Sequence, residues 1–408
     1  MLPHSVRTNG EPVEKSKHTE QSHTMKMKSF KTSWIYGFTF IFLLLSESVF
    51  SQDFRGEKLN GGDIVGRHIY GLATDYHGDP LLIEDKPLIY DKSDFQAMIN
   101  IDKALFMVSG FNQQIGGVYV TEVNPKNSQF IDTVALKGDK VGGFSFPTGG
   151  FKTSWNTMLM SENGRIDAAK PKKFIDSFRP YFKGKNGLVN PYKYGWVSEV
   201  IVLDAQGQAK AIKNYALGRM FANQVLVMPD NKTLYMLDGL GNLYLFVANQ
   251  EKSLAKGNLY AIDRENGQVN YTLLGKPAAL KVKFKLKKAS FKSIFKTAVP
   301  DISASNKNRC EKRFKYINTI YGEECLQVKK KYKKYAAFFE PVRVMAMKGI
   351  SSFTAENSRM KFNSDKNEMT FTVFKETVKN LSEGQAEIRL ALGNNANINS
   401  KYVIKDSK

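Results

Sequence analysis

Histidine and cysteine are scarce in this chain of 408 residues, which has only five histidines and two cysteines. Three of the histidines lie in the first 24 residues, so His68 and His77 are all that the rest of the chain offers for histidine-based catalysis. The sequence also lacks a glycine-rich phosphate loop, a G-x-S-x-G elbow and an H-E-x-x-H zinc motif. Carboxylates, arginines and turn backbone remain, and these are the groups that bind hard cations and phosphate.

Acidic residues are the next shortage, with 39 against 60 lysines and arginines, a net charge of +21 and a pI near 9.6. A cationic surface favours anionic small molecules, nucleic acid, anionic lipid or lipopolysaccharide, and the alternative is a solvated surface without a dedicated ligand. Residues 281–288 alternate lysine with apolar residues, which predicts a half-buried strand, or else a ridge for a polyanion. Residues 328–337 place tyrosines among lysines in a predicted short helix or turn, without a recognised nucleic-acid motif.

Long apolar runs are absent except for residues 34–45. Lysines precede this run and small residues follow it, so we interpret residues 25–51 as a secretory signal peptide and residues 1–24 as a non-structural extension. The run is short for a membrane span, although an uncleaved anchor is the alternative. The signal has no arginine pair, which predicts Sec-type export to the periplasm or the medium, with no transmembrane segment left after its removal.

The two cysteines, Cys310 and Cys325, lie 15 positions apart. In an exported protein such a pair predicts a disulfide. A pair of metal thiolates is the alternative, although no histidine or further cysteine lies nearby in the sequence.

Short strand-like segments separated by Gly, Asn and Pro turns predict an all-β fold. The clearest strands are at 117–121, 196–203, 233–237 and 243–248, with turns at 204–207 and 229–232. This pattern fits a sandwich, a barrel or a propeller, and periodicity alone does not choose among them. The last residues, 377–408, are polar and predict a frayed tail.

Four segments resemble the PhoX-type alkaline phosphatases, a family of secreted β-propeller enzymes. The segments follow one another in the family's order, at 147–162, 190–200, 215–248 and 314–349. The resemblance covers roughly residues 60–375 and implies a PhoX-like propeller domain at 52–376. The family's propeller has six blades, and the similarity stops before its last part, which implies an incomplete propeller here.

The resemblance implies metal-dependent hydrolysis of phosphomonoesters by iron and calcium ions, held by carboxylates and a cysteine thiolate. It assigns Glu162, Glu199 and Asp238 to metal-binding positions and Arg343 to a phosphate contact. It also places Cys310 and Cys325 at paired positions of the family, which supports the disulfide.

Four of the implied ligand positions are neutral in this chain: Thr148 where the family has cysteine, Asn223 and Ser358 where it has glutamate, and Gly239 where it has the second acid of an Asp-Asp turn. Losing about four anionic ligands leaves too little negative charge for the full cluster, so we expect no iron. Calcium on Glu162, Glu199 and Asp238 stays open, because calcium accepts varied oxygen ligands. The alternative for these three acids is a role in the surface or in turns.

The sequence therefore predicts a PhoX-like phosphatase homologue with weakened or lost activity, in the extreme a pseudoenzyme. Two alternatives stay open: a calcium-dependent phosphatase with a reduced metal set, and a non-catalytic exported binding or scaffold protein with a basic surface. The expected ligand is a phosphomonoester or another anionic small molecule. The lysine-rich segments predict a second partner, an anionic surface or polymer.

Overall fold

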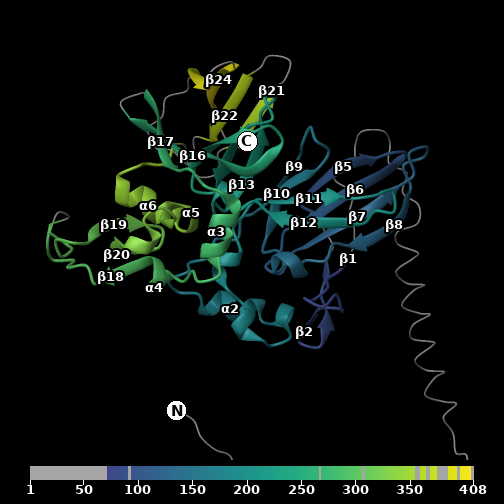
Figure 1. Cartoon of the computed structure of the whole chain (residues 1–408), viewed down its shortest axis with the longest axis horizontal. Helices are drawn as coiled ribbons and strands as arrows, with labels where there is room; N and C mark the ends of the chain where they lie inside the picture. Colours follow the sequence, from purple (N-terminus) through teal and green to yellow (C-terminus); the bar gives the residue numbers. More distant parts are fainter. Residues whose placement is uncertain are drawn as a thin grey trace, which may run out of the picture. The chain divides into compact units, whose positions relative to one another are not determined.

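The described part of the chain consists mostly of β-strands, in sheets that follow one another along the sequence (Figure 1). The computed structural model describes residues 71–90, 93–265, 268–305, 308–353, 359–363, 368–374, 385–392 and 396–405. All of these residues lie in one compact unit of the chain, Phe54–Lys408. The predicted signal peptide, His68 and Ser358 lie outside the described residues. In the described part, no helix combines the length and apolar character that a membrane span needs.

Three sheets are antiparallel meanders in which each strand pairs with the next along the chain. The first contains β5 (Phe95–Ile101), β6 (Ala104–Phe111), β7 (Gly117–Val123) and β8 (Phe130–Ala135). The second contains β9 (Pro147–Lys152), β10 (Met158–Glu162), β11 (Ser198–Val202) and β12 (Ala209–Lys213). The third contains β13 (Ala222–Val227), β14 (Thr233–Asp238), β15 (Leu243–Gln250), β16 (Ser253–Glu265) and β17 (Gln268–Gly275). The strands predicted at 117–121, 233–237 and 243–248 are confirmed, and the one predicted at 196–203 forms over Ser198–Val202.

A fourth sheet is mixed and lies near the end of the chain, with the order β21–β22–β24–β23. Its strands are β21 (Arg359–Asn363), β22 (Glu368–Phe374), β23 (Gln385–Leu392) and β24 (Ala396–Lys405), and β22 pairs with β24 in parallel. The prediction of a frayed tail at 377–408 was wrong for β23 and β24. Residues 385–392 alternate polar and apolar residues over most of their length, and this strand period outweighs the polar composition.

The first strands of these four sheets are neighbours in space. β5 contacts β9, β9 contacts β13, and β13 contacts β21. Successive sheets that meet through their first strands are arranged like the blades of a propeller, although the fourth sheet is mixed and the first three are meanders. The predicted all-β class is thus confirmed, with a propeller-like relation among these sheets.

The remaining elements are short. β1 (Gly71–Leu72) pairs with β4 (Ile89–Tyr90), β2 (Leu82–Ile83) pairs with β3 (Lys86–Pro87), and a three-stranded sheet has the order β18 (Phe295–Ala298), β20 (Gly322–Val328), β19 (Lys315–Thr319). The α-helices are α2 (Lys172–Phe178), α3 (Ala279–Leu286), α4 (Phe291–Ile294), α5 (Ala336–Phe339) and α6 (Pro341–Lys348). The 3-10 helices are η1 (Asp139–Val141), η2 (Pro180–Phe182), η3 (Asn186–Leu188), η4 (Pro191–Lys193), η5 (Tyr215–Leu217) and η6 (Lys330–Tyr332).

The strand predicted at 281–288 is wrong, because most of this segment lies in α3. Val282 and Leu286, four residues apart, are buried, whereas Phe284 between them is exposed. Residues four apart share one face of a helix, while in a strand all three side chains would share a face. The predicted basic helix or turn at 328–337 is confirmed as η6 and the start of α5.

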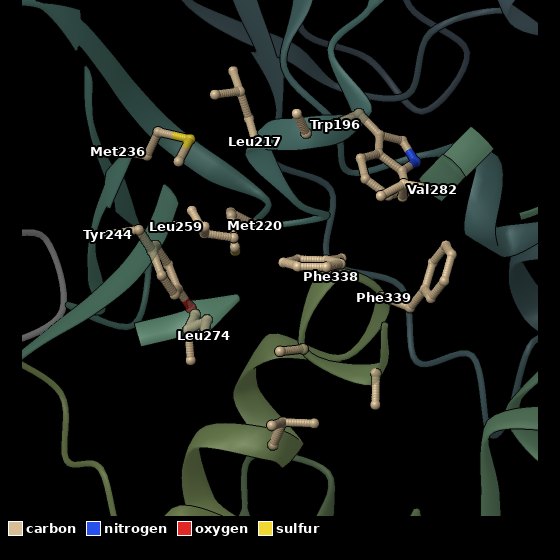
Figure 2. Close-up of a cluster of buried hydrophobic side chains, with 14 of the residues drawn as sticks. Trp196, Leu217, Met220, Met236, Tyr244, Leu259, Leu274, Val282, Phe338 and Phe339 are labelled. Atoms are coloured by element: carbon tan, nitrogen blue, oxygen red, sulfur yellow. The ribbon is translucent and has the colours of Figure 1, made fainter. Parts of the chain in front are cut away.

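The third sheet and the helices that follow it share one apolar core (Figure 2). Figure 2 shows Trp196, which precedes β11, close to Val282 of α3 and to Phe338 and Phe339 of α5. The rings of Trp196 and Phe339 meet edge to face with centroids 6.0 Å apart. Trp196 is fully buried, so this contact joins the second sheet to the helical segment.

The predicted disulfide is confirmed between Cys310 and Cys325, with the two Cα atoms 5.7 Å apart. It ties the segment before β19 to the middle of β20.

Replacing both cysteines with serine should lower the free energy of unfolding by about 3 kcal/mol, because the unfolded chain regains the freedom of a short closed loop. Chemical denaturation of the oxidised wild type and of the Cys310→Ser/Cys325→Ser variant measures the difference. Equal unfolding midpoints and slopes would contradict a stabilising role for the bond.

Candidate functional site

Three of the four neutral positions lie together where β9, β13 and β14 meet. Gly149, next to Thr148 in β9, has a left-handed φ of +62° and packs so closely on the carbonyl of Asn223 that a Cβ has no room. A Cβ at Gly239 would lie 3.2 Å from Asn223 Nδ2. The fourth position, Ser358, is outside the described residues, but the N–H of Met360, just beyond it, donates to Gln224 Oε1 at 2.7 Å. We take this junction as the candidate site.

Thr148 closes the site on the side of the first sheet. Its Oγ1 donates to Asp94 Oδ2 at 2.6 Å. Asp94 itself is exposed, just before β5. A hydroxyl–carboxylate hydrogen bond thus stands at the position where the resemblance implies a thiolate ligand.

Glu162, the last residue of β10, is completely buried and fully hydrogen-bonded. Oε1 accepts from Ser145 N and Lys213 Nζ, both at 3.0 Å. Oε2 accepts from Gly195 N at 3.0 Å and Trp196 N at 3.2 Å. Burial raises the pKa of Glu162, while the Lys213 charge and the hydrogen bonds oppose that rise. Four donors therefore surround this carboxylate.

Lys213, at the end of β12, supplies the positive charge beside Glu162. Its ammonium also donates to the carbonyls of Lys193, at 2.7 Å, and Gly143, at 3.2 Å, and lies 4.7 Å from the centre of the Tyr194 ring. Burial lowers the pKa of Lys213, and the Glu162 charge opposes this shift. We assign the pair as ionic, because all three ammonium protons have acceptors and both carboxylate oxygens have donors.

Lys213 was missed by the sequence analysis, although the sequence holds a signal for it. In a strand, Lys213 shares a face with Ala209 and Ala211, and the opposite face carries Lys210 and Ile212. In the structure Lys213 is buried and Ile212 exposed, the reverse of the usual preference. A lysine that shares a strand face with small residues thus indicates that the lysine is buried and paired with an acidic residue.

Asp238, at the end of β14, is held in a similar way. Oδ1 accepts from the backbone N–H groups of Leu240 and Asn242, each at 2.9 Å. Oδ2 accepts from Asn242 Nδ2 at 2.9 Å and from an Arg165 guanidinium nitrogen at 3.2 Å. The pKa of the neighbouring Tyr244 is raised well above its ordinary value, mainly because the side chain is buried and secondly because the Asp238 charge is close.

Arg165 is a second cation that the sequence analysis missed. Its side chain is 15% exposed, and its guanidinium carbon lies 5.7 Å from the centre of the Phe221 ring. One terminal nitrogen binds Asp238, and the other is buried without a hydrogen-bond partner among the described residues. A buried donor without an acceptor is costly, so this nitrogen is left with an unmet hydrogen-bonding capacity in the candidate site.

Glu199, the second residue of β11, accepts hydrogen bonds from the turn between β9 and β10. Its Oε1 accepts from Trp155 Nε1 and from Thr157 Oγ1, both at 2.7 Å. The same turn, with the β13–β14 turn, lines an open groove of about 500 Å³ at the end of β9 opposite to Thr148. Glu199 thus supports the wall of this groove.

The three acids predicted as remnant metal ligands are not brought together. Within the described ranges no group of three His, Cys, Asp or Glu side chains could hold a metal ion. Glu162 and Asp238 each spend both oxygens on four protein donors, including Lys213 and Arg165. The residues present therefore do not fit a calcium ion on these three acids, the possibility that the sequence left open.

Arg343, the predicted phosphate contact, lies in α6 and is fully buried. Its guanidinium binds Glu324 at 2.7 and 3.0 Å, and Glu340 and Asp167 at 2.9 Å each. Its carbon lies 4.0 Å from the centre of the Tyr321 ring. These carboxylates take up four of the donor contacts of Arg343, and its contact with phosphate stays a prediction.

Comparison with known proteins adds a distant likeness. No known family model and no curated protein matches the sequence. This chain is similar to a solved structure of Pseudomonas fluorescens PhoX in complex with vanadate, a transition state analogue. The match covers 73% of this chain and 79% of the PhoX chain, with 13% sequence identity and a TM-score of 0.36. At this identity and TM-score the likeness establishes neither the family nor a shared function.

Replacing Lys213 with methionine should lower the free energy of unfolding by about 3–5 kcal/mol, because it leaves the Glu162 charge buried without its partner. Lys210→Met is the matched control on the same strand, where the side chain is exposed, and should change stability by less than about 0.5 kcal/mol. Denaturant unfolding compares the two. Equal losses in both variants would show that the pair is not ionic.

Tyr215 offers a spectroscopic report of the Glu162 charge. The pKa of Tyr215 is raised to about 12, mainly because the side chain is buried and secondly because the Glu162 charge is close. Because the unfolded pKa is about 10, the stability that Tyr215 contributes is complete below pH 10 and is lost as the pH rises towards about 12.

In Glu162→Gln we expect this tyrosine to ionise at lower pH, since one negative neighbour is gone. The tyrosinate absorbance difference against the same protein with Tyr215→Phe isolates the group. An unchanged titration in Glu162→Gln, with Glu251→Gln as the exposed control, would mean that Glu162 carries no charge.

Proposed function

We propose that the chain is an exported, non-catalytic relative of the PhoX-type phosphatases that binds a phosphate-bearing anion without a metal. One observation carries the proposal: a cationic side chain of the protein lies against each of two predicted metal-binding carboxylates. Lys213 is 3.0 Å from Glu162, and Arg165 is 3.2 Å from Asp238.

Charge balance explains why these pairs oppose metal binding. A buried carboxylate that is neutralised by an ammonium or guanidinium must lose that partner before it can coordinate a cation. The displaced ammonium or guanidinium would then stay beside the metal ion, and the two positive charges would repel each other. The neutral residues Thr148, Asn223 and Gly239 supply no anionic ligand to offset this repulsion.

Anion binding needs hydrogen-bond donors where metal binding needs carboxylates, and the candidate site has such donors. Arg165 has one guanidinium nitrogen without a partner among the described residues. Asn223 lies beside the same carboxylate, because its neighbour Ala222 pairs with Asp238 across β13 and β14. A guanidinium and an amide can bind phosphate oxygens through charge-assisted and neutral hydrogen bonds.

The purified protein should show no turnover of a chromogenic phosphomonoester at alkaline pH, with or without added calcium and iron. Elemental analysis should find no stoichiometric iron, because a threonine stands at the thiolate position. Metal-dependent turnover that Glu162→Gln abolishes would refute the proposal and favour a phosphatase with a reduced metal set.

Inorganic phosphate should bind in calorimetry, and Arg165→Gln should weaken this binding about tenfold, as expected for the loss of a hydrogen bond to a charged group. Arg179→Gln is the control, because Arg179 is exposed and pairs with Asp176 at the surface. Equal affinity in wild type and Arg165→Gln would exclude Arg165 as the anion contact.

A further inference from the structure

We propose that α3 and the segment 329–334 form a surface that docks on an anionic lipid membrane. The residues 279–296 contain seven lysines and no acidic residue, and residues 328–335 contain five lysines and no acidic residue. We call these twelve lysines the lysine face. None of them forms an ion pair with a carboxylate in the described ranges.

The fold brings the two lysine-rich segments together. The Tyr332 hydroxyl donates to the carbonyl of Lys288 at 3.1 Å, and the Lys329 ammonium donates to the carbonyl of Lys292 at 2.6 Å. The Lys285 ammonium lies 5.5 Å from the centre of the Tyr335 ring. Segments about 40 residues apart in the chain thus present their charges on one surface.

Acidic residues on the adjoining strand do not neutralise this charge. Glu323 and Glu324 of β20 lie closest before the second segment. Glu323 pairs with Arg309 at 2.7 Å, and Glu324 pairs with Arg343 at 2.7 Å. The lysine face therefore keeps its positive potential, which attracts anionic surfaces.

Two large apolar side chains project from the middle of this charge. Leu280 is 81% exposed and Phe284 is 65% exposed, and the two lie four residues apart on one face of α3. The opposite face, about 200° away, carries Val282, which Figure 2 shows in the core near Trp196. The helix is thus fixed by its inner face while the outer face offers apolar groups to solvent.

A bilayer matches both parts of this surface, because anionic headgroups meet the lysines and acyl chains accept Leu280 and Phe284. Nucleic acid matches it less well. Single strands are held by exposed aromatic rings that stack on bases. Of the aromatic rings in the two segments, only that of Phe284 projects into solvent, since the Tyr332 ring is buried and Tyr335 packs against the apolar core and under Lys285.

Co-flotation with vesicles tests the proposal. The full chain should bind phosphatidylcholine vesicles that contain one-third phosphatidylglycerol at least tenfold more tightly than pure phosphatidylcholine vesicles, and added salt should weaken this preference. Because each variant keeps residues 34–45, a contribution of that apolar run is the same in all.

Two variants separate the charged and the apolar parts. Lys→Gln at Lys283, Lys287, Lys330 and Lys331 should remove the preference for anionic lipid, since each lysine contributes about fivefold. Leu280→Ser/Phe284→Ser should weaken binding about tenfold and keep the preference. All variants should unfold at the wild-type midpoint, because these side chains are exposed.

Matched controls exist elsewhere on the surface. Ile131→Ser/Val134→Ser removes apolar side chains that are 58% and 56% exposed on β8. Lys→Gln at Lys126, Lys137, Lys170 and Lys210 removes four exposed lysines. Both controls should bind vesicles like the wild type. Equal weakening by test and control variants would overturn the proposal, as would tight binding of duplex DNA by a protein that does not bind the vesicles.

Discussion

The ion pair between Glu162 and Lys213 is the constraint on which the second sheet depends. Each charge would cost several kcal/mol to bury alone, so the two groups are stable only when they meet with every polar atom satisfied. Their partners come from the loop before β9, from the loop before β11 and from the ends of β10 and β12. One carboxylate and one ammonium thus fix the positions at which four strands begin or end, including β9, which lines the candidate site.

Buried arginines apply the same principle in the helical segment. Glu340 receives hydrogen bonds from Arg343 at 2.9 Å and from the Tyr192 hydroxyl at 2.7 Å, and it lies 3.8 Å from Arg219. Arg219 donates to four backbone carbonyls, among them those of Tyr194 and Phe339. Basic residues therefore have two separate uses in this chain. A few act as internal links between elements, and many lysines stay on the surface. A net charge of +21 cannot distinguish these uses, because it counts both kinds alike.

Local patterns foretold much of the fold and little of the site. Strands such as 233–237 and the disulfide followed from alternation, turn residues and the cysteine count, which are local properties. The segment 281–288 was misassigned because its alternation of lysine with Val282, Phe284 and Leu286 fits a strand, whereas burial of every fourth residue decided for a helix. The partners of Lys213 could not be foretold, since Glu162 lies 51 positions away and only packing of β10 beside β12 through β11 brings them together. Arg165 was missed for the same reason, because its partner Asp238 lies 73 positions further along the chain.

The neutral positions and the internal cations make physical sense only when they are considered together. If a protein loses metal ions from a buried site, the carboxylates that held them become uncompensated and must be replaced or paired. On the proposed relation to the PhoX-type phosphatases, Thr148, Asn223 and Gly239 correspond to replacement, and the pairs Glu162–Lys213 and Asp238–Arg165 correspond to pairing. Loss of ligands alone would leave Glu162 as an unpaired charge in the core, and a new lysine alone would repel the metals. On the proposed relation, both changes together give a site that is neutral without any ion, with one buried guanidinium nitrogen that has no acceptor among the described residues.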